Sequence, residues 1–292
     1  MKPLKKGLLK IFQRQGNSYK PLGQGENNMR EIIKEAKRIV VKIGTSSLTH
    51  ENGRVNLDKM ERLSRVLTDI NNSGKEVILV SSGAIGAGMQ RIGRSKRPEE
   101  LPLKQATAAI GQAILMQMYE KFFGEYNQVI AQILLTKDVI EDEIKKVNAK
   151  NTFETLLDLG VIPIVNENDS ISTTQIEGYR FGDNDTLSAT VAQLIDADLL
   201  ILLTDIDGLY TANPKESDEA TLITQVDEIT PEIKGLAGDA GSRLGTGGMI
   251  TKIMAAEIAK ACGAHTIVAS GEHIDILNAI LSGEELGTWF VA

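Results

Sequence analysis

RIVVKIG at residues 38–44 is the first of three stretches that together indicate the fold class. NLDKMERLSRVLTDINNSG follows at residues 56–74, and EVILVSSG at residues 76–83. The two outer runs are rich in valine and isoleucine, which is typical of strands buried in a parallel sheet. Asn56 suits a helix N-cap, and Gly74 suits the position after the last turn. The middle run is expected to be a helix whose apolar face contains Leu57, Met60, Leu63, Leu67 and Ile70. Together these runs predict a strand, a helix and a second, parallel strand.

The same alternation continues along the rest of the chain. Further strands are expected at residues 128–135, 161–167, 199–205, 221–226, 265–270 and 287–292. Further helices are expected at residues 104–123, 148–159, 184–195, 247–262 and 273–281. Because no linker-like stretch follows residue 38, residues 38–292 are expected to form one α/β domain around a mainly parallel sheet.

Composition and charge exclude several classes of protein. The 292 residues are 42% hydrophobic, which is enough for a large core, and the net charge of −7 argues against a nucleic-acid partner. A single cysteine excludes an intrachain disulfide, and the three histidines lack the spacing of metal ligands. No apolar run approaches the length that spans a membrane. We therefore expect a cytoplasmic protein with no membrane partner.

Residues 1–37 differ in composition from the remainder. The first 20 residues contain six basic side chains and no acid. Several glycines and a proline follow, which favours a flexible basic extension over a transit peptide, the alternative. We expect this extension to have no part in the chemistry.

Five polar or glycine-rich clusters follow strand ends, where open α/β sheets bind their ligands. These clusters are KIGTSS at 42–47, SSGAIGAG at 81–88, NEND at 166–169 leading to GDND at 182–185, TDIDGLY at 204–210, and GTGGMITK at 245–252. Five such loops along one edge of a sheet predict a site for two ligands.

Two of these loops are rich in glycine. GTGGMITK precedes a helix and suits a phosphate, although it does not have the P-loop spacing and could instead be a flexible cap. SSGAIGAG also lacks the dinucleotide-binding spacing, because Arg91 stands where that pattern has a glycine. We expect Gly83, Gly86 and Gly88 to let a small ligand or a phosphate approach the backbone.

Charged side chains concentrate in the other loops. Lys42 lies in or just beyond an apolar strand, which favours an anion site over a side chain that extends to solvent. The acids Glu167, Asp169, Asp183 and Asp185 could form a metal site, pair with lysines or bind an ammonium group, and Asp183 or Asn184 could cap the next helix. Lysines, glycine N–H groups and an aspartate together favour phosphoryl transfer. A carboxylate acceptor is already ionised near neutral pH, so it needs no general base.

Six motifs in a fixed order resemble those of the glutamate 5-kinases of the amino acid kinase superfamily. They are KIGTSS, SSGAIGAG, NENDSIS, FGDNDTLSA, LLTDIDGLYTANP and GTGGMITK. The resemblance runs from about Arg38 to the C-terminus. It implies an α/β fold, namely a three-layer αβα sandwich around a mainly parallel eight-stranded sheet. The N-terminal part would bind glutamate and the C-terminal part ATP. It also implies that this chain lacks the C-terminal PUA domain of many bacterial members.

The resemblance implies ATP-dependent phosphorylation of the γ-carboxylate of L-glutamate, the first step of proline biosynthesis. Another superfamily member with a different carboxylate or phosphate acceptor is the alternative, and a regulatory protein without catalysis is a further one. Proline would be a feedback inhibitor, glutamyl phosphate reductase would act downstream, and the chain would form a dimer or tetramer.

Residue roles are also implied by the resemblance. Lys42 and Lys252 would stabilise the transferring phosphoryl group, and Asp185 would orient both lysines. Glutamate would bind to Ser82, Asp169 and Asn184. No protein metal site is expected, and Mg²⁺ would be held mainly by the nucleotide phosphates. ATP would contact Lys42, Thr204, Asp205, Gly245, Thr246, Gly247, Gly248, Met249 and Lys252.

Overall fold

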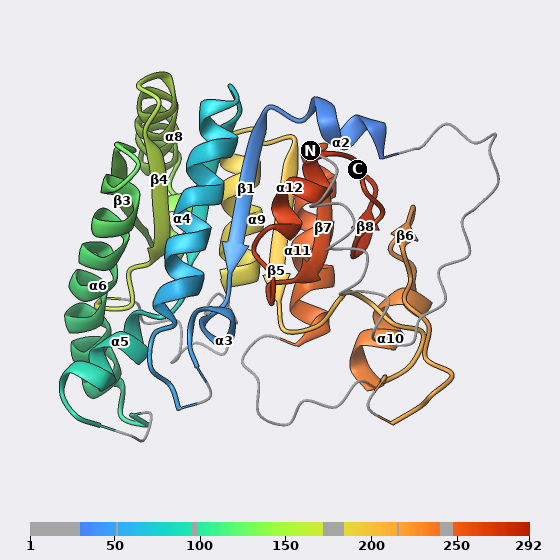
Figure 1. Cartoon of the computed structure of the whole chain (residues 1–292), viewed down its shortest axis with the longest axis horizontal. Coiled ribbons are helices and arrows are strands. Elements are labelled where there is room, and N and C mark those ends of the chain that lie inside the picture. The colour runs from blue at the N-terminus through green and yellow to red at the C-terminus, as the bar shows by residue number, and fades with distance from the viewer. Residues whose placement is uncertain (1–29, 51, 95–97, 172–183, 215, 240–247) are drawn as a thin grey trace.

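The computed structural model describes residues 30–50, 52–94, 98–171, 184–214, 216–239 and 248–292, which form one eight-stranded sheet with helices on both faces (Figure 1). The order across the sheet is β3-β4-β2-β1-β5-β7-β8-β6. All neighbouring strands are parallel except β7 and β8, which are antiparallel. The strands are β1 (Arg38–Ile43), β2 (Glu76–Ser81), β3 (Ile130–Leu135), β4 (Ile162–Glu167), β5 (Leu199–Thr204), β6 (Gln225–Val226), β7 (His265–Ser270) and β8 (Thr288–Phe290).

The helices cover the sheet in two layers, with α4 and α6 on one face and α9 and α11 on the other (Figure 1). A separate apolar core fills each interface between a layer and the sheet, so the expected three-layer αβα sandwich is confirmed. The helices are α2 (Glu31–Glu35), α3 (Thr45–Leu48), α4 (Leu57–Asn72), α5 (Ala84–Arg91), α6 (Leu101–Gly124), α7 (Lys137–Glu141), α8 (Glu143–Asp158), α9 (Asn184–Leu194), α10 (Pro231–Asp239), α11 (Met249–Ala261) and α12 (Ile276–Leu281).

Alternation along β1 decides which layer each of its side chains meets. Ile39, Val41 and Ile43 belong to the core that includes α4 and α6. Val40 belongs to the core that includes α9 and α11. Because successive side chains in a strand point to opposite faces, Lys42 shares the face of Val40. The strand therefore delivers one lysine to the layer that contains α9 and α11.

Two elements differ from the sequence-based expectation. The strand expected at 221–226 is only Gln225–Val226, at the edge of the sheet beside β8. The helix expected from residue 148 begins at Glu143 instead, because the Asp142 side chain accepts hydrogen bonds from the backbone N–H groups of Ile144 and Lys145. Within the described residues, no helix is long and apolar enough to cross a membrane.

The N-terminal boundary of the packed domain also differs from the expected one at residue 38. Arg30 is 3% exposed and Ile33 is fully buried in the core. The Arg30 guanidinium donates to the carbonyl oxygens of Leu286 at 2.6 Å and Thr224 at 2.5 Å. Residues 30–37 are therefore part of the folded domain. Residues 1–29 of the expected flexible extension lie outside the described residues.

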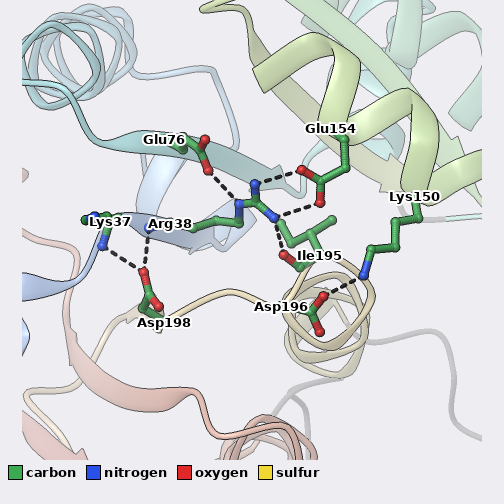
Figure 2. A network of polar contacts seen from close by, with 8 residues as sticks. All are labelled: Lys37, Arg38, Glu76, Lys150, Glu154, Ile195, Asp196 and Asp198. Carbon is green, nitrogen blue, oxygen red and sulfur yellow. Dashed lines mark hydrogen bonds and ion pairs between the residues drawn. The ribbon is translucent and has the colours of Figure 1, made fainter. Parts of the chain in front are cut away.

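Arg38 connects four elements at the edge of the sheet where the parallel strands begin (Figure 2). Its guanidinium donates to Glu76 at 2.6 Å and binds both carboxylate oxygens of Glu154 at 2.8 Å. It also donates to the carbonyl oxygen of Ile195, and Asp198 accepts from the backbone N–H of Arg38 at 2.8 Å. A bidentate Arg–carboxylate pair of this kind is geometrically specific. The network ties β1 and β2 to α8 and to the end of α9.

Helices α5 and α6 approach each other closely at two glycines. A Cβ atom on Gly111 would lie 1.6 Å from the carbonyl oxygen of Ala84, and one on Gly88 would lie 2.0 Å from that of Thr107. The expectation that Gly88 serves ligand approach is therefore wrong, because backbone already fills the space beside it. At Gly83, φ is +114°, and nothing lies within 4 Å of an added Cβ. A left-handed turn there suits glycine.

Candidate functional site

The polar clusters meet at the carboxyl ends of the parallel strands. Lys42 lies near the end of β1, and Ser82 directly follows β2. Thr204 is the last residue of β5. In register, Lys42 is level with Leu202, so β1 and β5 end side by side. As expected for an open parallel sheet, residues far apart in the sequence share one edge.

Asp185 joins two lysines from different elements. Lys42 Nζ lies 2.6 Å from Asp185 Oδ1, and Lys252 Nζ lies 3.0 Å from Asp185 Oδ2. Asp185 is in the first turn of α9, and Lys252 is in the first turn of α11. All three are buried, with exposed fractions of 0% for Asp185, 7% for Lys42 and 4% for Lys252. Two ammonium groups with one carboxylate give a buried cluster of net positive charge, which suits an anionic ligand.

Thr251 completes the environment of this carboxylate. Its hydroxyl oxygen lies 2.8 Å from Asp185 Oδ2 and 2.7 Å from the Gly248 carbonyl oxygen, so the two acceptors share its hydrogen. Burial raises the pKa of the Asp185 carboxyl, but the positive charges of Lys42 and Lys252, with the hydrogen bonds from Lys42 and Thr251, lower it by more. The net shift of the pKa is downward, so Asp185 is ionised throughout the neutral range.

This shift predicts how stability depends on pH. Because folding lowers the pKa of Asp185 below its ordinary value of 3.8, the carboxylate stabilises the protein fully above that value. The contribution is lost as pH falls below 3.8 toward the lower, folded-state pKa. We expect the free energy of unfolding of Asp185→Asn to fall less steeply than that of the wild type below about pH 4. Urea unfolding of both proteins between pH 3 and 7 measures this, and parallel curves would contradict it.

A line of amide side chains borders the cluster on the side of β2 and β4. Asn184 Nδ2 donates to Ser82 Oγ at 2.7 Å and to Asn166 Oδ1 at 3.1 Å. Asn166 Nδ2 in turn donates to Gln112 Oε1 at 2.9 Å. Since Asn184 directly precedes Asp185, the start of α9 links this amide line to the lysine cluster. Ser82 and Asn184 were expected at one site, and the structure brings them into contact.

The remaining expected residues follow strand ends or begin a helix, as far as the structure describes them. Asp169 is in the turn after β4, two residues beyond its last residue. Thr204 Oγ1 donates to Asp205 Oδ1 at 3.0 Å at the end of β5. Gly248 is the N-cap of α11, and Met249 is its first residue. Gly245, Thr246, Gly247 and the expected helix cap Asp183 lie outside the described residues.

Sequence reasoning assigned no role to three residues that contact the site. Thr251 stands inside the GTGGMITK motif, so its neighbour Lys252 was the available signal. Asn166 opens the NEND motif and was noticed only as an amide. Gln112 interrupts the apolar face of α6, where it is 8% exposed beside Ala108 and Leu115. A polar side chain at a buried helical position is the signal that would have identified it.

Four acids cluster in the sequence, and carboxylates of this kind could together hold a metal ion. In the part of the chain that the structure describes, no three His, Cys, Asp or Glu side chains group as metal ligands. Instead, one of the four acids, Asp185, pairs with lysines. Of the three alternatives left open for these loops, the structure supports the lysine-pairing network for Asp185.

The comparisons with known proteins agree on one family. Residues 37–270 match the model of the amino acid kinase family. The glutamate 5-kinase of Clostridium perfringens is 56% identical over 265 residues, which are 90% of this chain and 98% of that relative. The glutamate 5-kinase of Moorella thermoacetica is 53% identical over 266 residues, which are 91% of this chain and 70% of that relative.

Solved structures show the same fold at low sequence identity. A carbamate kinase from Giardia lamblia bound to AMP-PNP has a TM-score of 0.62 at 19% identity, and the match covers 88% of this chain and 99% of that one. A UMP kinase from Bacillus anthracis has a TM-score of 0.57 at 15% identity and covers 88% of this chain and 96% of that one. By its sheet, its site motifs and these matches, the chain belongs to the amino acid kinase family.

Proposed function

We propose that this chain transfers the terminal phosphoryl group of ATP to the γ-carboxylate of L-glutamate, giving L-glutamyl 5-phosphate and ADP. The observation that carries the proposal is the buried Lys42–Asp185–Lys252 cluster at the carboxyl ends of β1 and β5. Relatives named glutamate 5-kinase are 49–56% identical over about 90% of the chain, which supports glutamate as the acceptor. The reaction is the first step of proline biosynthesis.

Glutamate binds on the side of β2 and β4 in this proposal. Asn184 donates to Ser82 Oγ, so the Ser82 hydroxyl hydrogen can be donated to a substrate carboxylate. Asp169, in the turn after β4, is the acid assigned to the substrate ammonium group. A carboxylate facing an ammonium group supplies a charge-assisted hydrogen bond, which is stronger than a neutral one.

ATP binds on the side of β5 and α11. Thr204 and Asp205 lie at the end of β5, and Gly248 and Met249 begin α11. The first N–H groups of a helix are unpaired and favour phosphate oxygens, and α11 is 13 residues long. Gly245, Thr246 and Gly247 extend the same loop in the sequence. We treat Mg²⁺ as part of the nucleotide substrate, held mainly by its phosphates.

The transfer itself needs charge neutralisation more than proton transfer. One oxygen of the γ-carboxylate attacks the γ-phosphorus of ATP, the bond from that phosphorus to the β–γ bridging oxygen breaks, and ADP leaves. No proton moves, because the acceptor is already ionised. Lys42 and Lys252 offset the repulsion between the two anions and the charge that develops on the transferring group. Asp185 holds both ammonium groups in place, at 2.6 and 3.0 Å.

Glutamate-dependent formation of hydroxamate tests this function, because hydroxylamine traps an acyl phosphate. With ATP, Mg²⁺ and L-glutamate we expect hydroxamate and ADP in equal amounts. Aspartate and N-acetylglutamate serve as matched acceptors, and each should give less than a tenth of the rate with glutamate. A tenfold lower rate corresponds to a free energy of activation that is about 1.4 kcal/mol higher. A higher rate with either acceptor than with glutamate would contradict the assignment.

Regulation and assembly follow the same family pattern in this proposal. Proline shares the α-carboxylate and cationic amine of glutamate but offers no γ-carboxylate, so it competes at Ser82, Asp169 and Asn184 without becoming phosphorylated. Inhibition in the hydroxamate assay should then be relieved as the glutamate concentration is raised. Inhibition that does not depend on the glutamate concentration would contradict a shared site.

The chain assembles as a dimer or tetramer, which light scattering measures. Glutamyl phosphate reductase consumes the product.

A further inference from the structure

Gln112 is a buried amide on α6 that the proposed reaction leaves without a role. It is 8% exposed, and its neighbours on the same helix face are Ala108, Leu115 and Tyr119. Its Oε1 atom accepts a hydrogen bond from Asn166 Nδ2 at 2.9 Å. Its Nε2 atom is fully buried and has no hydrogen-bond partner within the described residues. A buried donor without an acceptor destabilises the folded state, so this glutamine does not stand here for stability alone.

Three hydrogen bonds connect Gln112 to Ser82, and Asn184 is the donor in two of them. Asn166 donates to Gln112, and Asn166 Oδ1 then accepts from Asn184 at 3.1 Å. Asn184 Nδ2 uses its second hydrogen on Ser82 Oγ at 2.7 Å. An amide NH₂ has two hydrogens, so both of those on Asn184 are committed. Because Asn184 donates to Ser82 Oγ, the Ser82 hydroxyl hydrogen can be donated elsewhere, and Asn184 Oδ1 can act as an acceptor.

Reversing one amide in this line would reverse the next. If the Asn166 side chain turned by 180°, its NH₂ would face the NH₂ of Asn184, and two donors repel each other. Asn184 would have to turn as well and would then present Oδ1 to Ser82. The Ser82 hydroxyl would donate to that oxygen and could no longer donate to a substrate carboxylate. The orientation of a buried amide therefore decides whether this half of the site offers the donor that an anion needs.

We propose that Gln112 is a positioning residue of the glutamate site and acts through Asn166 and Asn184. Its Oε1 atom presents an acceptor to Asn166, which favours the orientation of both asparagine amides that suits substrate binding. The inference rests on the proposed function. Gln112 itself contacts Asn166, and the effect on glutamate passes through the two asparagines. The nucleotide half of the site, at β5 and α11, is not part of this line of hydrogen bonds.

The test is Gln112→Met, which keeps the unbranched shape and removes both polar atoms. We expect KM for glutamate to rise about tenfold or more, while KM for ATP changes less than twofold. The melting temperature should change little, because the variant exchanges one buried unpaired donor, Gln112 Nε2, for another, Asn166 Nδ2. Gln112→Leu is a second variant of similar volume in case the first does not fold.

Two comparisons separate positioning from a purely structural effect. Thr107→Val is the matched control, because Thr107 is fully buried five residues earlier on α6 and its hydroxyl donates to the Leu103 carbonyl at 2.6 Å. It should leave KM for glutamate unchanged. In Asn184→Ala, where the line is already cut, adding Gln112→Met should raise KM no further, whereas independent effects would multiply.

The outcomes are distinguishable from those of the proposed function. A wild-type protein that forms no hydroxamate with glutamate contradicts the function. If the wild type is active, an unchanged KM for glutamate in Gln112→Met overturns the positioning role alone. Equal rises of KM for glutamate and ATP, or multiplicative effects in the double variant, also overturn it.

Discussion

Replacing Lys42 or Lys252 with methionine is expected to lower kcat about 10²- to 10³-fold in each case. Methionine keeps most of the apolar stem, so each change removes mainly the ammonium group that lies 2.6 or 3.0 Å from Asp185. The remaining lysine and Thr251 still satisfy that carboxylate, which should preserve the fold. What is lost is the net positive charge of the buried cluster, and with it the attraction for the transferring phosphoryl group.

Lys260→Met is the control, because Lys260 lies on the same helix as Lys252 but donates to the carbonyl oxygens of Asp227 and Val291. Its kcat should match that of the wild type. Steady-state hydroxamate formation, with folding checked by circular dichroism, gives the three values. Near-wild-type kcat in either Lys42→Met or Lys252→Met would exclude the proposed mechanism.

Gly111→Ala is expected to lower the free energy of unfolding by more than about 3 kcal/mol, an effect at the upper end for added volume in a packed interior. The new Cβ would lie 1.6 Å from the Ala84 carbonyl oxygen and 2.5 Å from the Gly88 backbone nitrogen. Both contacts are to backbone, so no side chain can move aside, and α5 and α6 must separate.

The control lies in the same helix. At Gly124 nothing stands within 4 Å of an added Cβ, so Gly124→Ala should be neutral or stabilise by up to about 1 kcal/mol. Urea unfolding of both variants measures the difference. Because α5 begins two residues after Ser82, any folded Gly111→Ala protein should also show a raised KM for glutamate. Equal stability of the two variants would show that α5 and α6 do not need this contact.

Much of the fold could be predicted from the sequence because its signals are local. The apolar runs at residues 38–44 and 76–83 and the helical face from Leu57 to Ile70 predict their elements from periodicity alone. These became β1, β2 and α4, but Leu57 is 56% exposed and so lies outside the buried face of α4. The parallel sheet follows from their alternation. The predicted bounds were wrong for the short strand β6 and for the start of α8, which the Asp142 side chain caps.

The motifs identified the residue types of the site but not their partners. Lys42, Asp185 and Lys252 were expected to act together, because lysines, glycine N–H groups and an aspartate in these motifs favour phosphoryl transfer. Distances of 2.6 and 3.0 Å could not be read from the sequence, because 143 and 67 residues separate Asp185 from the two lysines (185 − 42 and 252 − 185). Only the packing of α9 and α11 on one face of β1 brings the three charges together.

The mainly parallel sheet, the family and the polar residues at the strand ends could all be predicted from the sequence, because periodicity and motifs are properties of short segments. Tertiary structure alone decided three things: that Gly88 serves helix packing, that Arg30 belongs to the domain, and that Gln112 reaches the site through Asn166. Each depends on a contact between segments distant in the chain. Such a contact is fixed by how whole elements pack against one another, and no local pattern of residues encodes it.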